Sequence, residues 1–251
     1  MLTAVGLVLG LAVVIGVVVL LTGTGDDDET AATTSVPDPT DLPEDLPEPV
    51  APVELPEPPP GTTLTDDTPC PPADGADDRV QQFAGPPPDC LTPGASYRAT
   101  FSTTLGDFTA ELDVDAAPAT VNNFVVLSRY RYYHGVPFHR IVPGFVIQAG
   151  DGDGPPWGSN DLGYTIEDEL PDSSAAYVDY SLAMANAGPD TNGSQFFVVL
   201  PDGGGQLQPL YSHFGQVVEG QDIVDAIAAL GGVGEEPTEV VLIDSVTISE
   251  S

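Results

Sequence analysis

Apolar and polar side chains alternate along the part of the chain in which a folded domain begins. Every second residue is apolar or small over Tyr97–Phe101, and the same alternation returns over Phe108–Val114 after the turn at Leu105-Gly106-Asp107. A period of two residues is typical of a strand with one buried face. Two such runs joined by a short turn containing glycine predict a β-hairpin.

A helical spacing of apolar residues follows in two places. Pro118 suits the first turn of a helix, and Val121, Phe124 and Val125 then fall on one face. The run Gln221–Leu230 has the same periodicity and ends at Gly231-Gly232, as a helix commonly does. We therefore expect two helices, each with an apolar face toward the core.

A last strand, Glu239–Ile248, ends the domain that began near Tyr97. Strands dominate this interpretation, and the domain, residues 97–251, both begins and ends with a strand. This arrangement favours a mainly β architecture in which the first and last strands pair and close a barrel.

The stretch Phe138–Asp151 places two polar side chains among apolar neighbours. An unpaired guanidinium or amide is costly to bury, so Arg140 and Gln148 need partners or a ligand. Pro143-Gly144 interrupts the run, and a proline inside a strand pattern changes the direction of the chain after it. The pattern predicts two strand pieces that meet at a turn.

A second stretch, Ser181–Phe197, surrounds a turn-forming region with uncharged amides. Asn186, Asn192 and Gln195 lie around this turn, just before the apolar strand Gln195–Leu200. Neutral amides offer both donors and acceptors. They are suited to holding a peptide backbone.

The N-terminus has a different character from the domain. Leu2–Leu21 is an apolar run of the length that a helix needs to cross about 30 Å of hydrocarbon. It is longer than the usual core of a cleavable signal, although Thr22–Gly25 leaves cleavage possible. We interpret residues 1–22 as a transmembrane anchor, with a signal segment as the alternative.

Residues 23–69 are rich in Asp, Glu, Pro and Thr and contain no aromatic residue. Such a composition cannot bury enough apolar surface to fold, and its prolines favour an extended form. It predicts a disordered acidic stalk. A docking site for a proline-binding module is an alternative, but no Pro-x-x-Pro with a basic flank is present.

The two cysteines, Cys70 and Cys90, bracket an extension at residues 70–96. In an exported chain such a pair usually forms a disulfide, and closing a loop of about 20 residues stabilises by roughly 3 kcal/mol. A two-cysteine metal site is the competing interpretation, but no histidine lies nearby. A disulfide would favour a domain outside the cytoplasm.

The net charge of the chain disfavours one class of binding partner. Five Lys+Arg against 39 Asp+Glu give a formal net charge of -34. Phosphate binding relies on clustered cations, so a nucleic-acid partner is disfavoured.

The histidines His134, His139 and His213 lack metal-ligand spacing, and Asp151-Gly-Asp153 does not continue as a calcium loop. We expect no metal and no cofactor.

The two stretches at residues 138–151 and 181–197 resemble the most characteristic motifs of the cyclophilin family of peptidyl-prolyl cis-trans isomerases. The resemblance covers roughly Tyr97–Ile248 in order. It implies a closed eight-stranded antiparallel barrel capped by two helices, an isomerase of X–Pro bonds, and no cofactor. That reaction breaks no covalent bond, and its barrier of about 18–20 kcal/mol comes from amide resonance.

The resemblance also implies roles for individual residues. Arg140 matches the catalytic arginine, which stabilises the twisted amide by donating toward the prolyl nitrogen. The other positions that match catalytic residues of the family are Phe145, Gln148, Asn186, Phe197 and Tyr211. The positions that match substrate-binding residues are Val146, Ala185, Gln195 and Leu207.

Three positions depart from the family pattern. Val146 stands where many members have methionine, Tyr211 where they have histidine, and Gln206 near the usual tryptophan. Tyrosine can still stack and donate a hydrogen bond, so activity is expected. The missing tryptophan predicts weak binding of cyclosporin.

The sequence thus predicts a membrane-anchored isomerase whose monomeric domain lies outside the cytoplasm and acts on X–Pro segments of exported polypeptides. A proline-peptide-binding chaperone module with little or no turnover is the alternative that Val146 and Tyr211 suggest. A barrel that only presents the acidic stalk to partners is a third, weaker one.

Overall fold

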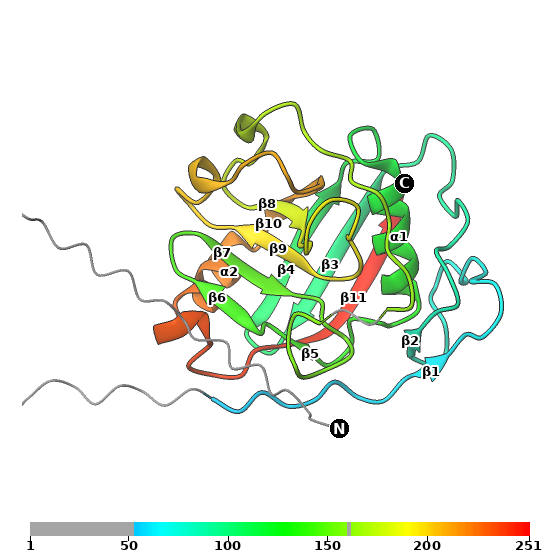
Figure 1. Cartoon of the computed structure of the whole chain (residues 1–251), viewed down its shortest axis with the longest axis horizontal. Helices are drawn as coiled ribbons and strands as arrows, with labels where there is room; N and C mark the ends of the chain where they lie inside the picture. Colours follow the sequence, from blue (N-terminus) through cyan, green and yellow to red (C-terminus); the bar gives the residue numbers. More distant parts are fainter. Residues whose placement is uncertain (1–52, 160–161) are drawn as a thin grey trace, which may run out of the picture. The chain divides into compact units, whose positions relative to one another are not determined.

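The computed structural model describes residues 53–159 and 162–251, and one curled antiparallel sheet organises them (Figure 1). Nine strands form this sheet in the order β5-β11-β3-β4-β10-β8-β9-β7-β6. Their bounds are β3 Tyr97–Thr103, β4 Gly106–Leu112, β5 Val136–Pro137, β6 Arg140–Val142, β7 Val146–Ala149, β8 Ser181–Met184, β9 Phe196–Val199, β10 His213–Glu219 and β11 Leu242–Glu250. The fold is mainly β, as the alternating pattern predicts.

The first and last strands of the domain pair, as expected. β3 and β11 run antiparallel from the pair Tyr97 and Glu250 to the pair Thr103 and Ile243. The sheet differs from the expected closed eight-stranded barrel, because it has nine strands and its ends, β5 and β6, share no ladder within the described ranges. β5 is two residues long and ends at Pro137, which has no N–H to donate to a further strand.

Two α-helices accompany the sheet in the described part of the chain, as predicted. α1, Pro118–Arg129, is buried from Thr120 to its end, and α2, Gln221–Ala228, buries Val224 and Ile227. α2 packs against β4, β6 and β7. Three short 3-10 helices, η1 Ser174–Ala176, η2 Gly204–Gln206 and η3 Val233–Glu235, lie in the connections.

The turn between β6 and β7 has the predicted break at Pro143-Gly144. Gly144 adopts a φ of 71°, which a side chain would make unfavourable. The hairpin pairs Arg140 with Gln148 across the two strands. Paired residues of antiparallel strands point to the same face, so this local turn brings the two polar side chains together.

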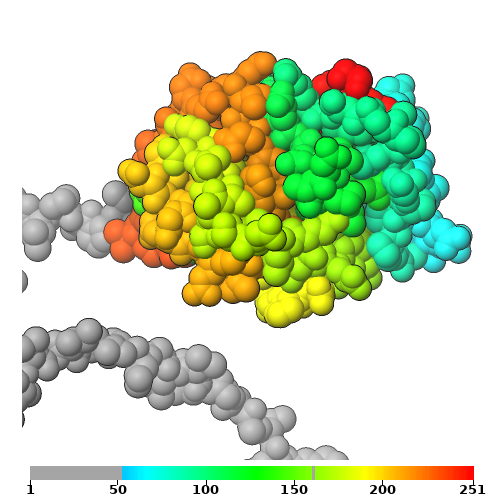
Figure 2. Space-filling model, turned by 90° about the horizontal axis from the view of Figure 1, so that it is seen from above, coloured from blue at the N-terminus to red at the C-terminus, as the bar shows by residue number. Residues whose placement is uncertain are grey.

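A segment before the domain packs onto it as an extension. β1, Thr62–Thr63, pairs with β2, Val80–Gln82, and Val80 and Phe83 join the main hydrophobic core. The segment is the blue-to-cyan part of the chain that lies against the domain in Figure 2. The predicted stalk extends to residue 69, whereas residues 62–63 form a strand, because the backbone N–H groups of Thr62 and Leu64 donate to the carbonyls of Arg79 and Gln82.

The predicted disulfide joins Cys70 to Cys90 within the extension. The Cys90 N–H donates to Oδ1 of Asn122 over 2.8 Å, and Nδ2 of Asn122 donates to the carbonyl of Pro88 over 2.9 Å. The bridged loop therefore covers the outer side of α1. This cover explains why α1 is buried on more than the one face that its periodicity predicts.

The anchor predicted at residues 1–22 and the stalk up to residue 52 lie outside the described residues. From Val53 onward, with Asn160 and Asp161 set aside, the structure contains no helix that is both long and apolar enough to cross a bilayer.

Candidate active site

A row of hydrogen-bonded polar side chains crosses one face of the sheet. Nη1 of Arg140 donates to Oε1 of Gln148 over 3.2 Å, and Nε2 of Gln148 donates to Oε1 of Gln195 over 3.0 Å. Nε2 of Gln195 in turn donates to Oδ2 of Asp151 over 3.2 Å. Three residues with predicted roles are thus joined directly, and each amide is oriented by the next.

Asp151 fixes the buried end of this row. Its side chain also accepts hydrogen bonds from the backbone N–H groups of Gly158 and Asp153. Burial raises the pKa of Asp151, while these backbone hydrogen bonds oppose the rise. An acceptor held in this way fixes the direction in which the Gln195 amide points.

A separate apolar cluster adjoins the row through β7 and β9. Register pairs Gln148 with Phe197, so the amide row and the aromatic ring come from facing strand positions. The rings of Phe197 and Tyr211 meet edge to face with centroids 5.3 Å apart. The predicted residues in the cluster are Phe145, Val146, Ala185, Phe197, Leu207 and Tyr211, together with Val142, Tyr177, Ala183 and Val199.

Four of the predicted residues lie at a cavity of about 240 Å³. Gln148, Ala185, Asn186 and Gln195 all line it. Asn186 is fixed by its own contacts, since Nδ2 donates to the carbonyl of Leu210 over 2.9 Å. Every predicted substrate position therefore lies in the row, the cluster or this cavity, whereas Cys70 and Cys90 lie apart on the extension.

Two residues complete the site without a signal in the sequence. The hydroxyl of Tyr177 donates to the carbonyl of Tyr211 over 2.7 Å and accepts from its N–H over 3.1 Å. Nε of Arg140 donates to Oε2 of Glu235 over 2.6 Å. Both partners are distant in sequence and stand in loops or irregular segments, so no spacing or motif indicates them.

His139, next to Arg140, is buried and uncharged at neutral pH. Burial lowers its pKa to about 4, and the positive charge of Arg140 contributes to the lowering. Its ring lies parallel to that of Trp157 at a centroid distance of 5.9 Å. Trp157 is the only tryptophan of the chain, and it stands away from Gln206, whose Nε2 donates to the carbonyl of Gly144.

This arrangement suits noncovalent work on a peptide. The apolar cluster offers a surface for a compact apolar ring, and the amide row offers donors and acceptors for a backbone. Arg140 is about one-third exposed, so its guanidinium is open to a ligand. Among the described residues, its Nη2 has no hydrogen-bond partner.

Comparisons with known proteins agree on one family. The model of the family described as cyclophilin type peptidyl-prolyl cis-trans isomerase/CLD matches residues 98–248. Peptidyl-prolyl cis-trans isomerase A of Mycobacterium tuberculosis is 38% identical over 176 residues, which cover 63% of this chain and 95% of that protein. Peptidyl-prolyl cis-trans isomerase CYP18-1 of Arabidopsis thaliana is 38% identical over 151 residues, which cover 59% and 94%.

A solved structure supports the same relationship. A cyclophilin type peptidyl-prolyl cis-trans isomerase of Cryptosporidium parvum superposes with a TM-score of 0.57 and 28% identity, covering 62% of this chain and 99% of that one. The same protein crystallised in the presence of the dipeptide Ala-Pro gives a TM-score of 0.56 and 29% identity, covering 61% and 99%.

Proposed function

The chain belongs to the cyclophilin-type peptidyl-prolyl cis-trans isomerase family, and on that premise we propose that it acts on X–Pro bonds of exported polypeptides, with Arg140 stabilising the twisted amide. The observation that carries the mechanism is the hydrogen-bonded row from Arg140 to Gln195 beside the apolar cluster. It offers one surface for a proline ring and another for the adjoining backbone.

The chemical argument starts from the amide itself. The barrier to rotation comes from delocalisation of the nitrogen lone pair, and the twisted state recovers that lone pair. A donor placed at the prolyl nitrogen stabilises the twisted state more than the planar one, which is the condition for catalysis. Arg140 suits this role because Gln148 and Glu235 hold its Nη1 and Nε while Nη2 is left for a substrate.

The other site residues have supporting roles in this proposal. The apolar cluster takes the proline ring, because its packed aromatic and aliphatic side chains suit a compact apolar ring. Gln148, Ala185, Asn186 and Gln195 hold the backbone from the cavity that they line. The oriented amides of the row discriminate backbone direction, since each is fixed by its neighbour.

The test is isomerisation of a short X–Pro peptide by the full chain beside its Arg140→Ala and Arg140→Lys variants. We expect acceleration by the wild type that falls about a hundredfold in Arg140→Ala, or about 2.7 kcal/mol of transition-state stabilisation. Arg140→Lys keeps the charge and loses the planar fork, so it should recover part of the rate. Undiminished catalysis by the alanine variant would refute the role of Arg140.

The same experiment separates the isomerase from the proline-binding module that Val146 and Tyr211 suggest. A folded wild-type chain that binds the peptide without accelerating its isomerisation would favour the binding module.

An exported role is proposed from the disulfide and the apolar N-terminal run. The Cys70–Cys90 bridge suits an oxidising compartment, and Leu2–Leu21 has the length of an anchor. Digestion of intact cells with an external protease, followed by detection of the domain, tests this location. The domain should be lost from intact cells, and its full protection would refute the proposal.

A further inference from the structure

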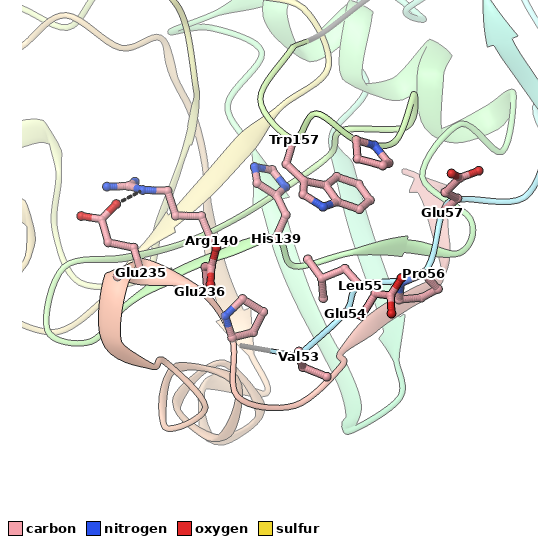
Figure 3. A pocket seen from close by; sticks show the side chains of 13 residues that line it. Val53, Glu54, Leu55, Pro56, Glu57, His139, Arg140, Trp157, Glu235 and Glu236 are labelled. Carbon is pink, nitrogen blue, oxygen red and sulfur yellow. Dashed lines mark hydrogen bonds and ion pairs between the residues drawn. The ribbon is translucent and has the colours of Figure 1, made fainter. Parts of the chain in front are cut away.

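A cleft of about 890 Å³ opens on the outer side of Arg140 (Figure 3). Four segments of the chain form its walls: Val53–Glu57, His139–Arg140, the loop at Pro155 and Trp157, and Gly234–Pro237. Arg140 belongs both to this cleft and to the amide row, because its Nε faces Glu235 and its Nη1 faces Gln148. The cleft therefore adjoins the row at Arg140.

The charge of the cleft is negative. Its acidic lining residues are Glu54, Glu57, Glu235 and Glu236. Arg140 is the only cation among the described lining residues, since His139 is neutral, which leaves a net charge of three negatives at neutral pH. Walls of one sign concentrate ligands of the opposite sign.

Two further features point to a ligand rather than to a solvated acidic surface. Nδ1 of His139 is buried without a hydrogen-bond partner, on a side chain that is only 8% exposed and lines the cleft. A buried polar atom of this kind is costly unless a ligand pairs with it. Beside it stands Trp157, whose indole ring attracts ammonium and guanidinium groups.

The wall at Val53–Glu57 leads directly into residues 58 and 59, which are anchored to the domain. Nη1 of Arg79 donates to the carbonyl of Pro59 over 2.7 Å, and Nη2 donates to the carbonyl of Gly152 over 2.8 Å. Pro58 is buried. Glu54 and Glu57 therefore precede an anchored part of the chain, and they lie outside residues 98–248, which the family model matches.

We propose that this cleft is a subsite for a lysine or arginine side chain that lies within a few residues of the substrate proline, so that the protein prefers cationic proline-containing polypeptides. This inference rests on the proposed isomerase function. The carboxylates of the cleft attract the cationic head, and Trp157 packs against it.

Two other occupants fit less well. In the ranges that the structure describes, no group of three or more His, Cys, Asp or Glu side chains could hold a metal ion, so these dispersed carboxylates suit a long organic cation. The chain preceding Val53 contains no Lys or Arg, so it cannot supply the cation itself.

The test is a series of X–Pro peptides with one lysine or one glutamine at each of three positions on either side of the X–Pro pair, assayed with the full chain. At low salt, lysine at one or two neighbouring positions should raise kcat/KM about tenfold over glutamine at the same position. The preference should shrink in 1 M salt, where the screening length is about 3 Å. It should also fall to about one in the variant Glu54→Gln/Glu57→Gln.

The control variant, Asp107→Asn/Asp244→Asn, removes the same two charges from exposed positions outside the cleft and should keep the preference. A preference that drops equally in both variants would show general steering by the anionic surface and overturn the subsite. Equal isomerisation of all peptides would overturn the subsite and leave the isomerase standing. No isomerisation of any peptide would instead refute the proposed function on which it rests.

Discussion

Nε of Arg140 donates a hydrogen bond to Oε2 of Glu235 over 2.6 Å, across 95 residues of sequence. The pair ties the proposed catalytic side chain to the loop that follows α2. Glu235 has a φ of 70°, a conformation that costs a residue with a side chain about 1–2 kcal/mol. The loop therefore holds an unfavourable backbone conformation at the residue that orients Arg140.

Replacing Glu235 should test this support. With a neutral X–Pro peptide, Glu235→Ala should lower kcat/KM about fivefold, because an exposed ion pair contributes up to about 1 kcal/mol. Glu235→Gln retains an acceptor at the same place and should stay within about twofold of the wild type. Steady-state rates at low and high salt would measure both, and equal rates for all three proteins would show that Arg140 needs no such support.

The neutral state of His139 predicts a pH dependence of stability. Its pKa is about 4 in the folded protein and about 6.5 when unfolded, so only the unfolded chain takes up the proton between these values. The contribution of the neutral His139 to the free energy of unfolding is at most about 3 kcal/mol. It is fully present above pH 6.5 and is lost as the pH falls toward 4. Urea unfolding of wild type and His139→Gln at pH 7.5 and 4.5 would measure it.

The variant should show a smaller loss of unfolding free energy between these two pH values. An identical loss in both proteins would mean that His139 titrates alike in the folded and unfolded chains. The difference between the two pH values is the readout, so any constant effect of the substitution cancels.

Tyr177 should act on the site through Tyr211. Tyr177→Phe removes the hydroxyl that bonds both the N–H and the carbonyl of Tyr211, which should cost about 1–2 kcal/mol of stability. Peptide KM should rise severalfold with less change in kcat, because the wall of the apolar cluster loosens. The matched control is Tyr180→Phe, which removes a hydroxyl that donates to Asp225 on the surface. This change should leave KM unchanged.

Arg79 should hold the extension on the domain. Its guanidinium donates to the carbonyls of Pro59, Gly152 and Tyr132 and lies over the Tyr132 ring at 5.5 Å. Arg79→Ala removes three hydrogen bonds, two of them partly buried, and should lower the free energy of unfolding by about 3 kcal/mol.

The control for Arg79 is Arg98→Ala, which removes an exposed arginine paired with Glu111. This change should cost less than about 1 kcal/mol. Chemical denaturation would compare the two variants, and similar losses would contradict the anchoring role of Arg79.

Breaking the disulfide should destabilise the extension and spare catalysis. The Cys70–Cys90 bridge closes a loop of 20 residues, so its removal should cost about 3 kcal/mol in the chain-entropy model. Thermal unfolding of Cys70→Ser/Cys90→Ser would show a lowered Tm, with peptide isomerisation near wild-type rates below it. Loss of activity in a folded variant would show that the bridged loop supports the site.

Local patterns in the sequence predicted the elements and part of the site. Alternation over Tyr97–Phe101 gave the first strand, and helical spacing after Pro118 gave α1. The break at Pro143-Gly144 also predicted the β6–β7 hairpin, which sets Arg140 opposite Gln148. These predictions succeeded because strand and helix periodicity and turn chemistry act over a few neighbouring residues.

Composition misjudged residues 53–69 for a physical reason. A count of apolar residues measures what a segment can bury by itself, and this segment is rich in proline and acid. In the structure Leu64 packs against the main core and Pro58 is buried, because surface supplied by distant residues replaces what the segment lacks. For the same reason, the sequence did not predict that the bridged loop covers the outer side of α1.

By itself the sequence determined the mainly β class, the two helices, the cysteine pair and the residues that match the cyclophilin motifs. Only the tertiary structure decided that Glu235 meets Arg140, that Tyr177 supports Tyr211, and that Glu54 lines the same cleft as Trp157. Such contacts join residues that lie in loops and far apart in the chain. No periodicity encodes them, since their partners are set by how the curled sheet brings distant loops together.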